Sequence, residues 1–171
     1  CKNVDAAIGR TALLYDAQAL SNFCNYYFME KDTEAFNKRF EQFLKLPTDK
    51  SFKYQTAFMC CMQAYLYNDA KKFNQYRNDF YSDDKNRAYD DYDLTIRYLE
   101  ILLLLKDENH PLAMDKLEAA IKFTRRNFTT HRVKAEKQNW DLFRLAIQKK
   151  PVKAKGSPIF RITEFIKGEL E

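Results

Sequence analysis

The sequence predicts an all-α protein, built as a right-handed array of antiparallel helical hairpins with about seven or eight helices in 171 residues. The chain has only three glycines and four prolines, whereas strand-rich folds need many of both for their tight turns. Apolar residues also recur every three or four positions along most of the chain. That spacing is the period of a helix with one buried face.

The composition favours a packed domain without a metal or cofactor. Hydrophobic residues make up 46% of the chain, so we expect a real core rather than disorder. The four cysteines, Cys1, Cys24, Cys60 and Cys61, lack the spacing of zinc ligands, and we expect them to be reduced. The longest apolar run, Ile101–Leu105, is far shorter than the roughly 18 residues of a membrane span. We therefore expect a cytoplasmic protein without a membrane span, with a lipid anchor on Cys1 as the alternative.

The first hairpin is predicted around the sequence EKDT, residues 30–33, which interrupts two aromatic stripes. Before this break the apolar positions with helical spacing are Leu13, Leu14, Ala17, Leu20, Phe23, Cys24, Tyr27 and Phe28. After it they are Phe36, Phe40, Phe43 and Leu44. Asp32 or Thr33 can cap the second helix through a side-chain oxygen.

Similar breaks divide the rest of the chain into further helices. They are expected at about 51–67, 73–81, 87–105, 111–123 and 131–148. Pro111 suits the first turn of its helix, because its missing N–H has no partner there. The hairpin array would occupy residues 1–148, and residues 149–171 would form a basic linker and a short capping helix. Phe40, Phe73 and Leu102 are expected in the core.

The two turn sequences EKDTEAF and YNDAKKF resemble each other, and their aspartates, Asp32 and Asp69, are 37 residues apart. The first hairpin resembles a tetratricopeptide repeat, whose period is about 34 residues. Its signature positions are occupied by Leu20, Phe23, Cys24, Tyr27, Phe36, Phe40 and Phe43. In the second hairpin they are occupied by Cys60, Cys61, Ala64, Phe73 and Phe80. Phe36 and Phe73 replace the usual alanine, and Arg77 also departs from the pattern.

This resemblance covers about residues 13–128. It implies a tetratricopeptide-like superhelix of the kind found in divergent bacterial repeat proteins, and a scaffolding role in a longer chain. The expected partner is a peptide or protein in the groove lined by the first helix of each hairpin. The predicted contact residues on those helices are Asn22, Asn25, Tyr26, Gln55, Gln63 and Arg97.

Two other functions are open from the sequence. The spacing of Arg126 and His131 in RNFTTH resembles the Arg-x4-His motif of HEPN ribonucleases, which implies a dimeric enzyme with these two catalytic residues. Residues 121–171 also hold 13 Lys and Arg against 5 Asp and Glu. Such a basic end can bind nucleic acid without catalysis. Its predicted basic patch is Lys149, Lys150, Lys153 and Lys155.

Overall fold

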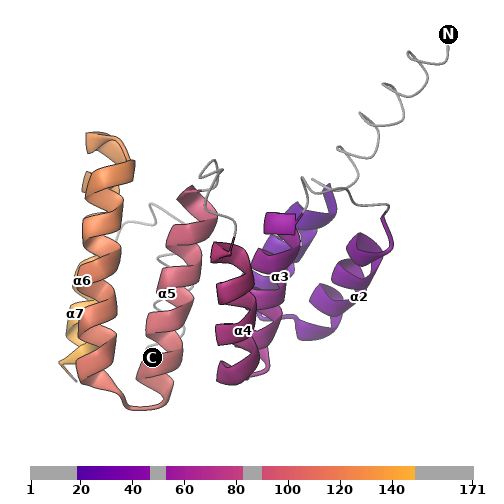
Figure 1. The fold of residues 1–171 in the computed structure, drawn as a ribbon, viewed down its shortest axis with the longest axis horizontal. Coiled ribbons are helices and arrows are strands. Elements are labelled where there is room, and N and C mark those ends of the chain that lie inside the picture. Colours follow the sequence, from indigo (N-terminus) through magenta and orange to yellow (C-terminus); the bar gives the residue numbers. More distant parts are fainter. Residues whose placement is uncertain (1–18, 47–52, 83–89, 149–171) are drawn as a thin grey trace, which may run out of the picture. The chain divides into compact units, whose positions relative to one another are not determined.

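A computed structural model describes residues 19–46, 53–82 and 90–148 (Figure 1). These residues form helices and the turns between them, without a strand, which confirms the all-α prediction. The helices are α2 (Thr33–Leu44), α3 (Lys53–Leu66), α4 (Ala70–Tyr81), α5 (Asp90–Lys106), α6 (His110–Asn127) and α7 (Thr130–Ile147). A further helical segment, residues 19–29, precedes α2. The predicted last helix lies outside the described residues.

The chain divides into two compact units, with the boundary between Asp83 and Asp84. Each unit is described by itself. The predicted boundary after residue 148 stays a prediction.

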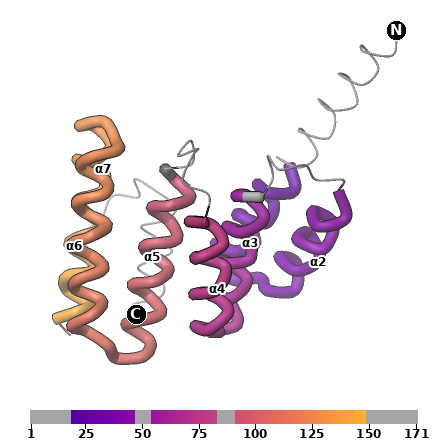
Figure 2. Tube along the Cα trace, viewed as in Figure 1, coloured from indigo at the N-terminus to yellow at the C-terminus, as the bar shows by residue number. Residues whose placement is uncertain are grey.

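In the first unit, two hairpins pack against each other. Residues 19–29 pair with α2, and α3 lies along α4, as the trace in Figure 2 shows. The rings of Phe28 and Tyr65 join the first hairpin to α3, with centroids 5.8 Å apart. Asn37 of α2 also donates a hydrogen bond to the hydroxyl of Tyr67 at 2.6 Å and accepts one from Gln63 at 2.8 Å. Apolar packing and amide hydrogen bonds therefore hold the two hairpins together.

In the second unit, α5 and α6 form a hairpin and α7 packs against both helices. The contact between α5 and α7 is aromatic, because the rings of Tyr98 and Phe143 lie 5.2 Å apart. Pro111 lies in the first turn of α6, as the sequence predicted. The predicted core residues Phe40, Phe73 and Leu102 are buried in their respective units.

Three of the turns between helices share one backbone geometry, in which a residue with positive φ ends the first helix. These residues are Lys31, Asn68 and Glu108, with φ of 56°, 53° and 53°. At the first turn, the N–H of Lys31 bonds to the carbonyl of Phe28 at 3.0 Å, and the N–H of Asp32 bonds to Tyr27 at 2.9 Å. The same pair of bonds occurs at the other two turns. Each turn is thus a Schellman motif, which satisfies carbonyls that the helix end would leave without partners.

The residue after each left-handed position caps the next helix. The caps are Asp32, Asp69 and Asn109, and they accept the backbone N–H of Ala35, Lys72 and Leu112 at 2.9, 2.9 and 3.4 Å. The bond from the Lys72 N–H holds the pKa of the Asp69 carboxyl below its usual range. Only two residues therefore separate the end of one helix from the cap of the next, and the chain reverses within that distance.

This shared turn places equivalent residues in the core of every hairpin. Eight positions before the cap, the buried residues are Cys24, Cys61 and Ile101. Four positions after it, they are Phe36, Phe73 and Ala113. The third hairpin, α5–α6, therefore has the same turn and core positions as the first two. Its cap, Asn109, lies 40 residues after Asp69, the cap in the second hairpin, although the two turn sequences do not resemble each other.

Two residues that the sequence assigned to an apolar face are exposed instead. Phe23 is 47% exposed and Leu44 is 53% exposed. Each lies next to a fully buried residue, Cys24 or Phe43. Neighbouring residues of a helix project about 100° apart, so only one of each pair can point into the core.

The left-handed positions give a test of the turn geometry. We expect Lys31→Gly and Glu108→Gly to raise the free energy of unfolding by up to about 1 kcal/mol each, because a Cβ atom is disfavoured at positive φ. Asn68→Gly should change it less, since asparagine tolerates this conformation. Urea denaturation would measure all three changes.

Lys45→Gly is the matched control. Lys45 ends α2 with a φ of −83°, where glycine relieves no strain. We expect this variant to be destabilised or unchanged. A loss of stability in Lys31→Gly equal to that in Lys45→Gly would contradict the geometry.

Candidate functional site

The most exposed aromatic side chains of the first hairpin lie together on residues 19–29. Phe23 and Tyr26 are 47% and 46% exposed, and they are three residues apart, so they share one side of the helix. The opposite side is fixed in the core by Ser21, Cys24 and Phe28. The exposure therefore follows from helical geometry, since no rotation of this helix buries both sets of residues.

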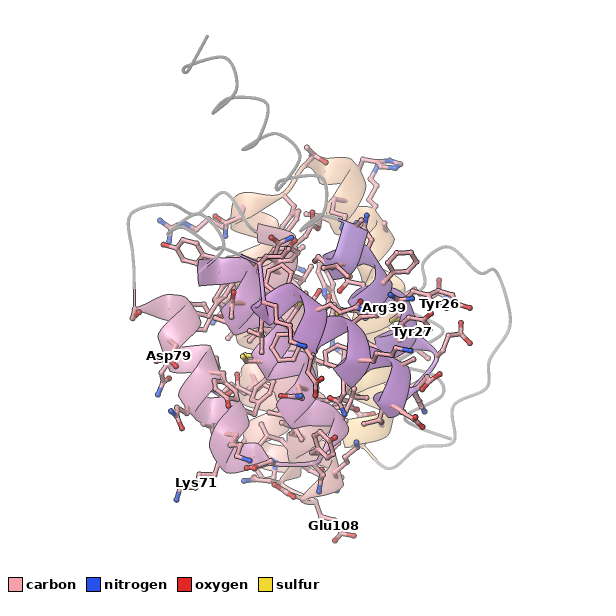
Figure 3. The ribbon with its side chains drawn as sticks, turned by 90° about the vertical axis from the view of Figure 1, so that its right-hand side faces the viewer. Tyr26, Tyr27, Arg39, Lys71, Asp79 and Glu108 are labelled. Carbon is pink, nitrogen blue, oxygen red and sulfur yellow. The ribbon has the colours of Figure 1, made fainter. Side chains whose placement is uncertain are left out.

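Arg39 of α2 joins this surface. Its guanidinium carbon lies 5.2 Å from the ring centroid of Phe23, within the range of a cation–π interaction. Tyr27 packs edge-on against Tyr26, with ring centroids 5.3 Å apart. Figure 3 shows Tyr26, Tyr27 and Arg39 together on the first hairpin. We call Phe23, Tyr26, Tyr27 and Arg39 the aromatic face.

The predicted contact residues are divided between this face and the interior. Tyr26 belongs to the aromatic face, and Asn22 and Asn25 lie on the same helix, exposed and half-buried respectively. Gln63 is used in the hydrogen bond to Asn37 that joins the two hairpins. Gln55 is half-buried on α3.

Arg97, the remaining predicted contact, is held within the second unit. Its Nε lies 2.7 Å from the carboxylate of Asp93, and its guanidinium carbon lies 4.4 Å from the ring centroid of Phe123. The sequence did not identify Phe23 and Arg39 as surface residues. The exposure of Phe23 could have been inferred from helical phase, because Cys24 and Phe28 mark the buried side of this helix.

The two residues of the Arg-x4-His motif lie on either side of the α6–α7 junction. Arg126 is in the last turn of α6 and His131 is in the first turn of α7, and both are exposed. Between them, Phe128 is extended and Thr129 caps α7 by accepting the N–H of Arg132 at 3.4 Å. The motif therefore spans a helix break with a capping threonine. The basic residues Lys149, Lys150, Lys153 and Lys155 lie outside the described residues.

The second unit contains a buried carboxylate, Glu136 of α7, which is 1% exposed. Its Oε2 accepts hydrogen bonds from the Tyr98 hydroxyl at 2.8 Å and from Asn139 Nδ2 at 2.7 Å. Its Oε1 lies 2.9 Å from Arg132 Nε. The Tyr98 hydroxyl in turn accepts the indole N–H of Trp140 at 3.0 Å. We call these five residues the Glu136 network.

The Tyr98 hydroxyl in this network acts as a hydrogen-bond donor to Glu136. Burial, together with the carboxylate of Glu136, raises the pKa of Tyr98 well above its ordinary value, so this hydroxyl stays protonated as a donor. Burial also raises the pKa of Cys24 and Cys61 to about 12 and that of Cys60 to about 11, which favours the protonated thiols. All three are free thiols, as predicted.

Over residues 19–46, 53–82 and 90–148, no group of His, Cys, Asp and Glu side chains could hold a metal ion. Among the helices of these same ranges, none is long and apolar enough to cross a membrane.

Comparisons with protein-family models, with curated proteins and with solved structures found no match to this chain.

The Glu136 network gives a prediction for stability. We expect Tyr98→Phe to lower the free energy of unfolding by roughly 2 kcal/mol, because Trp140 Nε1 and Glu136 Oε2 each lose a buried partner. Tyr67→Phe is the control. The Tyr67 hydroxyl also takes part in a hydrogen bond, but its side chain is exposed and water can replace the partner, so we expect a change within about 0.5 kcal/mol. Equal losses in the two variants would contradict the account.

The raised pKa of Tyr98 also predicts how its contribution to the free energy of unfolding depends on pH. Because the pKa is higher in the folded state, the contribution of Tyr98 is fully present below its unfolded pKa of about 10. It is lost as the pH rises above that value. The stability difference between wild type and Tyr98→Phe should therefore be constant from pH 6 to pH 9 and shrink in stronger alkali.

Proposed function

We propose that the protein is a tetratricopeptide-like helical scaffold that binds a peptide or a protein on its first unit. The observation that carries this proposal is the aromatic face, where Phe23 and Tyr26 are both nearly half exposed beside Arg39. The proposed site lies on the first hairpin, which packs against α3 of the second.

The residue types of the aromatic face suit a protein partner. Tyrosine, phenylalanine and arginine are enriched in protein interfaces, and tyrosine and arginine also among the residues that carry most of the binding energy. Covering Phe23 and Tyr26 removes apolar surface from water, which favours association. The cation–π contact holds the Phe23 ring and the Arg39 guanidinium in place before binding, so less side-chain entropy is lost.

The proposed site includes fewer residues than the sequence predicted. Tyr26 is at the centre, with Asn22 and Asn25 as polar neighbours on the same helix. Gln63 and Arg97 already make contacts within the protein, and we leave them out of the proposed site. The partner would lie along residues 19–29 and reach Arg39 on α2.

The tetratricopeptide resemblance is supported by the third hairpin. The positions four, eight and eleven residues after its cap hold Ala113, Leu117 and Ala120, all buried. Two of these are the small residues that the signature expects and that the first two hairpins lack. Small side chains let two helices approach closely, so α5 and α6 fit the proposed repeat family better than the hairpin from which the resemblance was first drawn.

A peptide selection would test the proposed function. Peptides would be selected from a random displayed library against the full chain, and their affinities measured by calorimetry. We expect Phe23→Ala and Tyr26→Ala to weaken the selected peptides at least about tenfold each, since truncating an aromatic anchor costs more than 1 kcal/mol. Both positions are exposed, so the fold should remain, which circular dichroism would check.

Leu112→Ala is the matched control for this experiment. Leu112 is 40% exposed on α6, so the variant removes a comparable apolar side chain elsewhere. We expect it to bind the peptides as wild type does. Peptides that depend on Leu112 and not on Phe23 or Tyr26 would place the binding surface elsewhere and contradict the proposal.

A further inference from the structure

Positive charge is concentrated where α6 and α7 meet. Residues 122–137 contain six Lys and Arg and a single acidic residue, Glu136. The exposed cations of this stretch are Lys122, Arg125, Arg126, Lys134 and Lys137. We call these five residues the junction patch. Both acidic side chains that the structure pairs within this stretch lie against Arg132, which is not part of the patch: the Oε1 of buried Glu136 at 2.9 Å and the carboxylate of Asp91 of α5 at 3.2 Å.

The fold brings the two halves of the patch together. Only Phe128 and Thr129 separate α6 from α7, so the last turns of α6 and the first turns of α7 lie at the same end of this helix pair. Arg125 and Arg126 follow Lys122 by three and four residues, and Lys137 follows Lys134 by three, so each set shares one helix side. Arg125 also reaches α7, where its guanidinium carbon lies 5.8 Å from the ring centroid of Trp140.

Farther from the junction, cations of both helices, Lys116 of α6 and Arg144 of α7, are paired, which sets the patch apart. Lys116 lies 2.9 Å from Glu100, and Arg144 lies 3.4 Å from Glu118. Within the described ranges, no acidic side chain pairs with Arg126, Lys134 or Lys137. In addition, α7 has no acidic residue in its first turn, although that is where the helix dipole favours one. The patch therefore presents cations with no counter-charge of their own.

The surroundings of the patch distinguish between its candidate anions. Anionic membranes are bound by cations mixed with exposed apolar residues that insert among the lipids. Protein interfaces likewise have an apolar centre. In the described part of the second unit, the one exposed large apolar side chain is Leu112, at the opposite end of α6. A phosphate backbone, in contrast, is bound chiefly by cations and needs no apolar centre.

We propose that the junction patch binds single-stranded nucleic acid through its phosphate backbone. Phe128 lies between the two sets of cations in the sequence, and the exposed part of its half-buried ring offers a base a surface to stack on. Its orientation is fixed by Phe123, with ring centroids 6.1 Å apart, and by Arg132, whose guanidinium carbon lies 5.8 Å from its centroid. Unpaired bases can stack on aromatic rings, which is why we specify a single strand.

The test is fluorescence anisotropy of the full chain with labelled oligo(U) and oligo(dT) of equal length. We expect binding that weakens as salt rises from 50 to 200 mM. The variant Arg126→Gln, Lys134→Gln, Lys137→Gln should bind roughly tenfold or more weakly, and its logarithmic salt slope should be smaller by about 2, since three phosphate contacts are lost. These three side chains are exposed on helices, so folding should persist, which circular dichroism would check.

Two control variants distinguish binding at this patch from an effect of the protein's total positive charge. Lys38→Gln, Lys45→Gln, Lys71→Gln removes the same charge from exposed positions of the first unit and should bind within about twofold of wild type. The variant Lys149→Gln, Lys150→Gln, Lys153→Gln tests the basic segment after α7. If either control loses as much affinity as the patch variant, the proposal is overturned.

The identity of the ligand is tested by competing anions. Binding of oligo(U), oligo(dT) or both supports the proposal, and binding of neither overturns it. A poly-glutamate peptide or anionic vesicles bound more tightly than both oligonucleotides would also overturn it, in favour of an acidic protein or a membrane. Cleavage of oligo(U) that disappears in His131→Ala would replace the passive binding site by the ribonuclease that the Arg-x4-His spacing suggests.

Discussion

The hairpins of this protein depend on one local constraint, a helix end in the left-handed conformation followed at once by a side-chain cap. At Lys31, Asn68 and Glu108 the backbone accepts a positive φ that glycine would adopt more easily. The two backbone hydrogen bonds of the Schellman motif and the cap of the next helix offset that strain. Because the reversal takes so few residues, the apolar sides of the two helices must face each other. The aromatic stripes and their burial follow from this turn.

The second unit adds a different kind of constraint at α7. Its connection to α6 has an extended residue, Phe128, in place of a left-handed one, so the turn itself fixes α7 less closely. The Glu136 network holds α7 in place, since a buried carboxylate with two hydrogen bonds and an arginine beside it has few alternative positions. With the interior fixed in these ways, the sides that remain exposed differ between the units. The first unit presents aromatic rings, whereas the second presents positive charge.

The sequence predicted the helices well because their signals are local. Periodic apolar residues and capping side chains act within a few positions, and Asp32 caps α2 as expected. The turn before α6 was predicted, but its likeness to the first two was missed, because the residues around Asn109 match neither earlier turn at equivalent positions, although the backbone geometry is the same. The candidate surfaces were harder to predict, since exposure depends on which side of a helix meets its neighbour. Phe23 looked like a core residue for that reason, and Arg97 looked free until its partners on α5 and α6 were in place.

Hydrogen exchange at three backbone amides tests the shared turn most directly. The N–H groups of Asp32, Asp69 and Asn109 bond to carbonyls of the preceding helix at 2.9, 2.8 and 2.8 Å, although these residues are exposed or only half-buried. The account predicts that all three exchange at least about 100-fold more slowly than in an unfolded chain, because their bonds break only when the hairpin opens. Exchange of any of the three at the unfolded rate, with the flanking helices still protected, would contradict it.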